Sequence, residues 1–345
     1  MTTNFRLHLG ARPGRQQGLT LIELMVAMAI SLVVVLAATT ALVISRQGFT
    51  NVDASAQLRD NARFAEDIIQ RLGVQAGFED LFHAASSPPP KTAGLDSTTV
   101  PNVFVYGFNN RARGASQGWS EANSAARTSG SLGYGSDILV LRFQPNVSNS
   151  KSNESDRALI DCAGEQPTQV PTSRYDRITS VLHVATSSAG EPALMCTRWS
   201  SGGTIDTQPL ISGVENFQVL YGVDGIGPSN STIPATSTAD SVVDRYLRAD
   251  QLTVSDESVT AANWQRVRSI RIGLVLRASP GTAVDRTTQT FYPLGPAPQA
   301  ANGTAGSMFA NNSADPGSVF TPTADGRLRQ VLTFTVHLRN PQGEL

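Results

Sequence analysis

The chain has 345 residues, and its 27 lysines and arginines are nearly balanced by 28 aspartates and glutamates, for a formal net charge of −1. Only 16% of the residues are charged, which excludes a nucleic-acid-binding protein that works by bulk positive charge. The mean hydropathy is slightly negative although one segment is strongly apolar, so the remainder is polar. The length allows one sizeable domain, or two small ones, beyond that segment.

The apolar segment follows a basic leader. Between Arg15 and Arg46 the sole charged residue is Glu23, and no charge occurs from Leu24 to Ser45. A helix of that length crosses ~30 Å of hydrocarbon at ~1.5 Å per residue. The segment is longer than the apolar core of a secretory signal, and no small-x-small cleavage site follows it. The basic leader predicts a cytoplasmic N-terminus and export of everything after Ile44.

The residues around Glu23 allow two interpretations. One is a plain signal anchor whose carboxylate lies near the lipid headgroups. The other rests on Gly18-Leu-Thr-Leu-Ile-Glu-Leu-Met25, which resembles the class III signal of type IV pilins and type II secretion pseudopilins. In that family a prepilin peptidase cuts after the glycine and methylates the new N-terminal amine. The resemblance therefore implies that the leader, residues 1–18, is removed between Gly18 and Leu19.

The resemblance also implies an assembly role for Glu23, which becomes the fifth mature residue. In the family, an acidic residue there pairs with the N-terminal amine of a neighbouring subunit. An amine and a carboxylate attract strongly in a low dielectric, and each is costly when left alone. The sequence departs from the commonest pattern in two ways: Leu19 stands where phenylalanine is most frequent, and the leader is long.

The helix is predicted to continue beyond the membrane. No proline occurs between Pro13 and Pro88, and apolar residues recur at alternating steps of four and three. Such a one-sided stripe is typical of a helix that packs on a domain. Its members are Leu58, Ala62, Ala65, Ile69, Leu72 and Ala76. We expect a transmembrane half at 19–45 and an amphipathic half at 46–77.

Three glycines and one threonine affect the predicted stability, end and straightness of this helix. Gly48 is a weak point within it, costing ~1 kcal/mol relative to alanine. Gly73 and Gly77 are the expected stop signals. Major pilins usually have a helix-kinking proline at the position of Thr40, so its absence favours a minor pilin or a pseudopilin.

From residue 78 onwards the sequence is typical of strands. Loops rich in Gly, Ser, Asn and Pro separate them, and no helix-length segment intervenes, so parallel crossovers are not expected. The predicted strands are Val103–Phe108, Asp137–Phe143, Ile178–Thr186, Ala193–Trp199, Gln208–Val223, Val267–Ala278 and Gln330–Arg339. We predict an α+β, type IV pilin-like fold. In it, residues 78–345 form one antiparallel sheet, or one sheet with a small second one, that packs on the amphipathic half of the helix.

The two cysteines, Cys162 and Cys196, both fall in the segment predicted to be exported. An even count in an oxidising compartment favours a disulfide, which contributes roughly 3–4 kcal/mol by loop entropy. Two buried free thiols are the alternative. No metal site is expected at either cysteine, because neither has a cysteine or histidine at ligand spacing.

Four segments of the C-terminal half narrow the resemblance to minor pilins of the PilW type, over the J-type pseudopilins. They are 214–224 (VENFQVLYGVD), 243–246 (VDRY), 267–277 (VRSIRIGLVLR) and the last strand, 330–340. Little of 80–135 takes part. The resemblance implies a subunit that helps to initiate, prime or cap a type IV pilus. Its implied partners are other minor pilins, the major pilin, the prepilin peptidase and the inner-membrane assembly platform. A tip adhesin is a further candidate.

Catalytic motifs are weak. Gly114-Ala-Ser-Gln-Gly118 matches the G-x-S-x-G nucleophile elbow, which would make the chain a membrane-anchored periplasmic hydrolase using Ser116. That elbow needs a buried strand before it and a helix after it, whereas polar residues flank this one, so a chance match is the preferred explanation. His183 and His337 lie within strand patterns and are expected to be sheet residues. We therefore expect no catalytic residue and no cofactor.

Calcium binding near Asp224, Asp240 and Asp244 is an alternative left open. The spacing departs from D-x-D-x-D-G, and solvated turn residues are the preferred interpretation. A J-type pseudopilin of a type II secretion system remains the main alternative to a minor pilin.

Overall fold

The structure is a computed structural model that describes residues 18–80, 103–114, 124–147, 154–168, 170–171, 176–199, 205–226, 239–283, 285–295 and 315–340. The predictions for the leader before Gly18 and for Ser116 lie outside these residues. The chain divides into two compact units, Met1–Thr50 and Asn51–Leu345, which are described separately.

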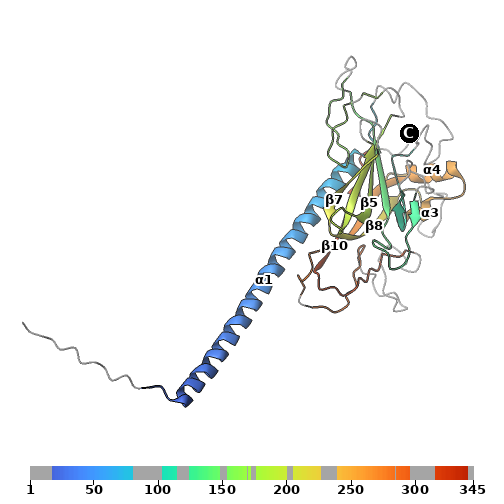
Figure 1. The fold of residues 1–345 in the computed structure, drawn as a ribbon. Coiled ribbons are helices and arrows are strands. Elements are labelled where there is room, and N and C mark those ends of the chain that lie inside the picture. Colours follow the sequence, from blue (N-terminus) through green and yellow to red (C-terminus); the bar gives the residue numbers. More distant parts are fainter. Residues whose placement is uncertain are drawn as a thin grey trace, which may run out of the picture. The chain divides into compact units, whose positions relative to one another are not determined.

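The first unit contains the first half of α1, the helix Leu21–Gln75 (Figure 1). Every side chain from Leu21 to Thr50 is exposed, including leucines, isoleucines and valines on all sides of the helix. Among the described residues, this is the one helix long and apolar enough to cross a membrane. A helix that is apolar all round needs an apolar solvent, so these properties fit a membrane span.

The second half of α1 buries one face. All six residues of the predicted stripe, from Leu58 to Ala76, are buried. A Cβ atom on Gly73 would lie 2.6 Å from Cγ1 of Val336, so this glycine allows a close approach. The prediction that Gly73 stops the helix is therefore wrong. The stop is at Gly77, where a φ of 79° turns the chain and the N–H donates to the Arg142 carbonyl at 3.0 Å.

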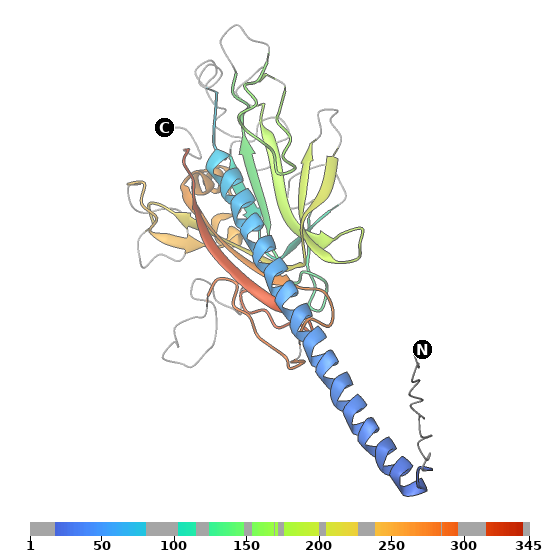
Figure 2. The same cartoon turned by 90° about the vertical axis from the view of Figure 1, so that its left-hand side faces the viewer.

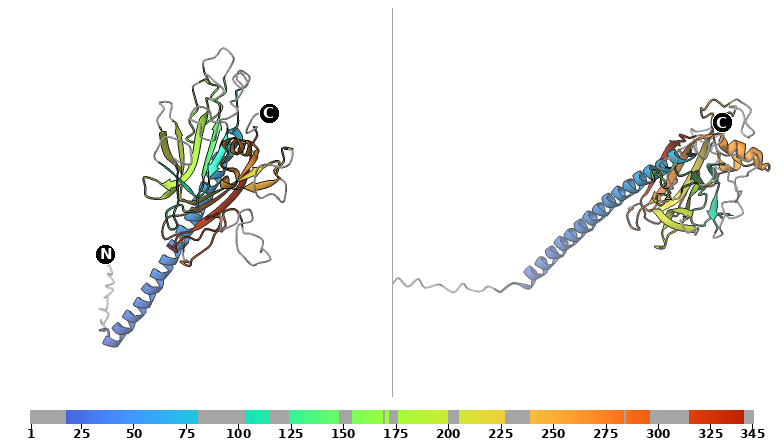
Figure 3. Two further views of the ribbon diagram at one scale, coloured as in Figure 1. Left: turned by 90° about the vertical axis from the view of Figure 1, so that its right-hand side faces the viewer. Right: turned by 90° about the horizontal axis from the view of Figure 1, so that it is seen from above.

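The first sheet of the second unit has five antiparallel strands in the order β1-β4-β5-β6-β7. They are β1 (Val105–Phe108), β4 (Ile138–Phe143), β5 (Ile178–Thr186), β6 (Pro192–Trp199) and β7 (Ile205–Ser212). Figures 2 and 3 show its green to yellow-green strands on one side of the second half of α1 and β11, in red, on the other.

The second sheet has four antiparallel strands in the order β11-β10-β8-β9. They are β8 (Val214–Val223), β9 (Arg245–Leu247), β10 (Val267–Arg277) and β11 (Arg329–His337). Three further kinds of element complete the described fold: the two-stranded sheet β2 (Arg111–Arg113) with β3 (Ser124–Ala126), the turn of helix α3 (Ala249–Leu252), and the helix α4 (Glu257–Gln265).

Two sheets of similar size are found, whereas the sequence predicted one sheet, or one sheet with a small second one. The reason is Gly213, which lies inside the segment 208–223 that reads as one strand. Its φ of 83° ends β7, and a Cβ there would collide with the carbonyl of Arg277. The chain therefore leaves the first sheet and enters the second at this residue. The antiparallel pairing itself is confirmed.

Hydrogen bonds of the backbone and the side chain of Asp137 join the two sheets. The Asp137 N–H donates to the Phe217 carbonyl at 2.8 Å, and the Val219 N–H donates to Oδ2 of Asp137 at 2.8 Å. The start of β4 in the first sheet thus runs beside β8 in the second. Trp264 of α4 packs edge-on against Tyr221 at 4.6 Å between ring centroids, which closes the core on that side.

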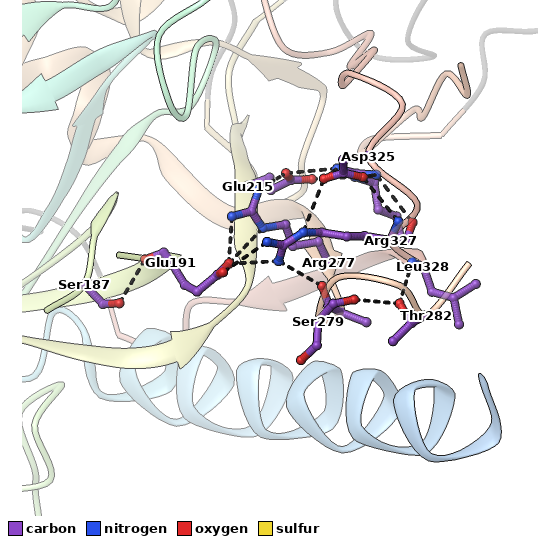
Figure 4. A network of polar contacts seen from close by, with 11 residues as sticks. Ser187, Glu191, Glu215, Arg277, Ser279, Thr282, Asp325, Arg327 and Leu328 are labelled. Carbon is purple, nitrogen blue, oxygen red and sulfur yellow. Dashed lines mark hydrogen bonds and ion pairs between the residues drawn. The ribbon is translucent and has the colours of Figure 1, made fainter. Parts of the chain in front are cut away.

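A network of ion pairs also spans the sheets (Figure 4). Arg277 of β10 contacts Glu191, just before β6, at 2.7 Å and Glu215 of β8 at 2.8 Å. Arg327 reaches Glu191 at 3.0 Å, and Arg329 reaches Glu215 at 2.6 Å. Hydrogen bonds from Arg327 and Arg277 hold the pKa of Glu191 below its usual value. Alternating charges therefore link the start of β6 to three strands of the second sheet.

Candidate processing and assembly site

The residues around the predicted cleavage point precede the first helical turn. Gly18, Leu19 and Thr20 are exposed and have no regular structure, and α1 begins at Leu21. A Cβ on Gly18 would have no neighbour within 4 Å. The peptide bond between Gly18 and Leu19 therefore lies outside the helix, and no described residue packs on Gly18.

Glu23 turns back to the start of its own helix. The backbone N–H and the hydroxyl of Thr20 both donate to Oε2 of Glu23, at 3.0 and 2.8 Å. In return, the Glu23 N–H donates to Oγ1 of Thr20 at 3.3 Å. This reciprocal pair is a capping box, and a carboxylate in the first turn also favours the positive end of the helix dipole. Sequence reasoning missed it, although the signal T-x-x-E at residues 20–23 was present.

The capping box places the carboxylate where an assembly role would need it. Glu23 is fully exposed and lies one turn from Leu19, the residue whose amine processing would create. Between Glu23 and Arg46, the helix offers apolar side chains and the hydroxyls of serine and threonine. Several of these hydroxyls donate to backbone carbonyls, such as Ser31 to Met28 and Thr40 to Leu36. An incoming cation would therefore find one acceptor of full negative charge on this half of the helix.

Cys162 and Cys196 form a disulfide, with 5.7 Å between their Cα atoms. Both are buried, Cys196 in the middle of β6 and Cys162 on the segment before β5. The Cys162 N–H donates to the Ser180 hydroxyl at 3.0 Å, and Arg198, next to the bridge, contacts Asp161 at 3.1 Å. The bridge thus holds an irregular segment against the centre of the first sheet.

The two histidines are sheet residues, as predicted. His183 is buried in β5, and its Nε2 lies 2.9 Å from Oγ1 of Thr197. Burial, with Arg113 and Arg127 nearby, lowers the His183 pKa to about 3, so the ring is neutral at ordinary pH. His337 is the exposed last residue of β11.

The aspartates considered for calcium binding take part in hydrogen bonds with backbone N–H groups instead. Asp224 is buried, and its carboxylate accepts the N–H groups of Asp240 at 3.0 Å and Ser241 at 2.9 Å. Asp244 accepts the N–H of Gly225 at 2.7 Å. Among the described residues, no group of three or more acidic, histidine or cysteine side chains could hold a metal ion. Asp224 and Asp244 therefore act as acceptors that fix the turn after β8, and the prediction of solvated turn residues is wrong for buried Asp224.

Two family models match the chain. The prokaryotic N-terminal methylation motif covers residues 13–39, which include Gly18, Leu19 and Glu23. Type IV Pilus-assembly protein W covers residues 181–340, from within β5 to just after β11. The anchor helix with its processing motif and the β-rich second unit together define a type IV pilin-like protein. Within that class, residues 181–340 resemble the PilW type of minor pilin.

Other comparisons add little. A type IV-like pilin from Thermus thermophilus is similar over 83% of this chain and 98% of that chain, at 13% identity and a TM-score of 0.35. No curated protein matches the sequence. The match to a pilin family implies a structural protein with pilus-related partners, and the methylation motif implies processing by prepilin peptidase.

Proposed function

We propose that this minor pilin helps to initiate type IV pilus assembly and enters the filament at or near its tip with other minor pilins, without catalytic activity of its own. The observation that carries the proposal is Glu23, the single acidic residue on the exposed first half of α1, held at the helix start within the processing motif. A lone carboxylate at the edge of an apolar span needs a partner once the subunit leaves the headgroup region.

The proposed partner is the methylated amine of Leu19 in an adjacent subunit. In the single chain, Thr20 satisfies the Glu23 carboxylate with two hydrogen bonds. A cation would replace neutral donors by a charge-assisted contact, which is roughly twice as strong as a neutral hydrogen bond. Assembly then exchanges an internal cap for a contact between subunits.

The proposed topology follows from the same helix. The N-terminus stays cytoplasmic, α1 spans the inner membrane, and the second unit is periplasmic before it moves to the cell surface with the pilus. The proposed partners are the prepilin peptidase, the other minor pilins, the major pilin and the assembly platform, with a tip adhesin as a further candidate. The disulfide between Cys162 and Cys196 suits an oxidising compartment.

A Glu23→Ala strain tests the proposal. We expect normal protein level, membrane insertion and disulfide formation, because the hydrogen bonds of Glu23 run to Thr20 in the first turn of its own helix. Pilus number and co-purification of the other minor pilins should fall. Asp60→Ala is the matched control, since it removes an exposed carboxylate from the amphipathic half of the same helix.

Normal piliation and normal co-purification in the Glu23→Ala strain would contradict the assembly role. Deleting the whole gene separates the pilus from the secretion pseudopilus: surface pili should be lost while exoenzyme secretion continues. The reverse outcome would assign the chain to a type II secretion system as a J-type pseudopilin.

A further inference from the structure

The connection between β10 and β11 contains a short turn that packs on distant parts of the second unit. At this turn, the N–H and the hydroxyl of Ser318 donate to the Asp315 carbonyl at 3.2 and 2.8 Å, and both residues are buried. Further along the chain, Phe320 pairs with Phe291 through two backbone hydrogen bonds of 2.9 and 2.8 Å. We call residues 315–318 the latch. The bridge between Phe291 and Phe320 attaches the chain separately beyond it.

Two glycines bring the latch into backbone contact with the start of the first sheet. A Cβ atom on Gly317 would lie 2.6 Å from Nε2 of Gln218 and 2.8 Å from the carbonyl oxygen of Gly135. A Cβ on Gly135 would lie 2.5 Å from the Cα of Gly317, and both residues have a positive φ, of 85° and 105°. Neither position leaves room for a side chain. The latch therefore packs directly on Gly135 and on the buried side-chain amides of Asn216 and Gln218 in β8.

The latch also brings a carboxylate into a site that already holds one. The Asp315 residue is 1% exposed, and its carboxylate accepts a long hydrogen bond of 3.4 Å from Nδ2 of Asn109. The Asp137 carboxylate, just before β4, accepts the N–H groups of Asn110 at 2.9 Å and Val219 at 2.8 Å. Asn109 and Asn110 are neighbours in the turn between β1 and β2. Adjacent residues of one turn therefore hold the two buried acids.

The charges around this pair of acids do not neutralise it directly. The other titratable groups that interact with the pair electrostatically are Arg127, Tyr221, Arg248 and Asp250. Arg248 contacts both carboxylate oxygens of Asp250, at 2.9 and 3.1 Å, and the guanidinium of Arg127 donates to three backbone carbonyls. Within the described part of the chain, neither Asp137 nor Asp315 forms an ion pair. The docked latch thus places two unpaired acids in one buried site.

Two such acids cannot both ionise without a large cost, because burial penalises each charge and the two charges repel each other. Burial accordingly raises the pKa of Asp315 to about 7, and burial together with Asp315 raises the pKa of Asp137. Once the latch is released, water reaches Asp315, and its pKa returns to the ordinary value of about 4. The docked latch therefore binds a proton more tightly than the released latch. Release becomes more favourable as pH rises from about 4 to about 7, and levels off above that range.

We propose that residues 315–318 form a proton-operated latch, which is docked while the buried pair Asp137 and Asp315 holds a proton and is released locally when the proton leaves. Release separates the two glycine backbones and uncovers the side-chain amides of Asn216 and Gln218, while both sheets stay paired. The second unit then has two forms that differ in this one segment. The inference does not depend on a role in pilus assembly.

Backbone hydrogen exchange of the full-length protein in detergent, at pH 6 and pH 8, tests the proposal. After correction for the intrinsic rate of exchange, the peptide that contains Ser318 should be about tenfold less protected at pH 8, because the docked form keeps its proton only up to about pH 7. At both pH values this peptide should exchange faster than a peptide around Cys196 in the middle of β6, because release is local. Equal protection of the two peptides would indicate global unfolding alone and overturn the proposal. So would equal protection of the Ser318 peptide at both pH values.

A matched pair of variants assigns the effect to the buried acid. Asp315→Asn has no proton to lose, so the change in protection of the Ser318 peptide between pH 6 and pH 8 should fall from about tenfold to less than about threefold. Asp285→Asn removes an exposed carboxylate from the same connection between β10 and β11 and should keep the wild-type change. A change that stays near tenfold in Asp315→Asn would contradict the latch.

A third variant opens the latch without changing a charge. Gly317→Ala places a Cβ 2.6 Å from Nε2 of Gln218 at a φ of 105°, so the latch should be released at both pH values. The Ser318 peptide should then be weakly protected at pH 6 and pH 8 alike, while the peptide around Cys196 keeps more protection. Wild-type protection of the Ser318 peptide in this variant would overturn the proposal. Protein level and the intact disulfide report folding, and if Asp315→Asn does not fold, the wild type and Gly317→Ala still decide.

Discussion

The two halves of α1 differ in where their apolar residues lie, although they form one helix. From Leu21 to Thr50, every side chain is exposed, and apolar residues occur all round. From Asn51 onwards, apolar residues are buried along one stripe that ends at Ala76, and charges such as Arg63 and Asp67 lie off it. In the first half, overall apolarity matters more than the identity of any one residue. In the second half, a change of one methyl group at the right position is felt.

The largest expected effect comes from Gly18, which precedes both halves of α1 and belongs to the processing motif. Gly18→Glu should leave the leader attached, while α1 and the second unit still form. Intact-mass analysis of membrane-extracted protein would show the full-length precursor. Gly18→Ala is the milder control and should be processed at least in part. A wild-type protein that keeps its leader would contradict the whole processing scheme.

The next largest effect comes from removing the disulfide, which belongs to the second unit alone. Replacing Cys162 and Cys196 with serine should destabilise the second unit by about 2–5 kcal/mol and leave membrane insertion unchanged. Chemical unfolding of the wild type with and without reductant measures the same difference, and the double variant should not respond to reductant. Thiol labelling without reductant should find no free cysteine in the wild type. Two labelled thiols would show that the domain stands without the bridge.

A matched pair of glycines tests the difference between the halves directly. Gly73→Leu should destabilise the second unit by about 1–3 kcal/mol, because its Cβ would lie 2.6 Å from Val336 and the core is overpacked. Gly48→Leu should not, since a Cβ there meets nothing within 4 Å and leucine is a better helix former by up to about 1 kcal/mol. Urea unfolding of the two variants provides the measurement. Equal losses would show that both halves pack on the protein.

The smallest effect is a pH dependence confined to the second unit. Burial raises the pKa of Asp315 to about 7, with Arg248 opposing and Asp250 adding to the shift. The native state then binds a proton that the unfolded chain releases near pH 4, so stability is greatest at low pH and falls as pH rises through 7. Between pH 6 and 8 the expected loss is about 1.4 kcal/mol.

Asp315→Asn should remove most of this slope, and Asp285→Asn should not, because Asp285 is exposed and hydrogen bonds from Thr287 lower its pKa. Buried Asp137, whose pKa is also raised by burial and by Asp315, would account for any slope that remains. Thermal unfolding of the wild type and the two variants at pH 6 and pH 8 measures this pH dependence. A wild type that is more stable at pH 8 would contradict the assignment.

The parts of the fold that follow from periodicity were predictable. The stripe from Leu58 to Ala76 and the strands β5, β10 and β11 were expected within one or two residues of their observed bounds. The division into two sheets was not, because Gly213 interrupts a run that otherwise reads as one strand. The helix α4 was missed because its nine residues are mostly polar, with only Ala261 and Trp264 among its apolar residues buried.

The site was predictable in its residues but not in its local geometry. Glu23 was singled out as a charge in an apolar run, so its role as the acceptor of a capping box with Thr20 was overlooked. The ion-pair network of Figure 4 could not be read from the sequence, since Glu191 and Arg327 are separated by 136 positions. Contacts at that separation depend on how the two sheets meet.

The helix start has a consequence for the order of events in the membrane. The cap at Thr20 and the first turn at Leu21 both lie after the Gly18–Leu19 bond. The capping box therefore uses no residue of the leader. We expect the proposed cleavage and the folding of the exported part to be independent, so that a subunit cut before folding and one cut afterwards reach the same state.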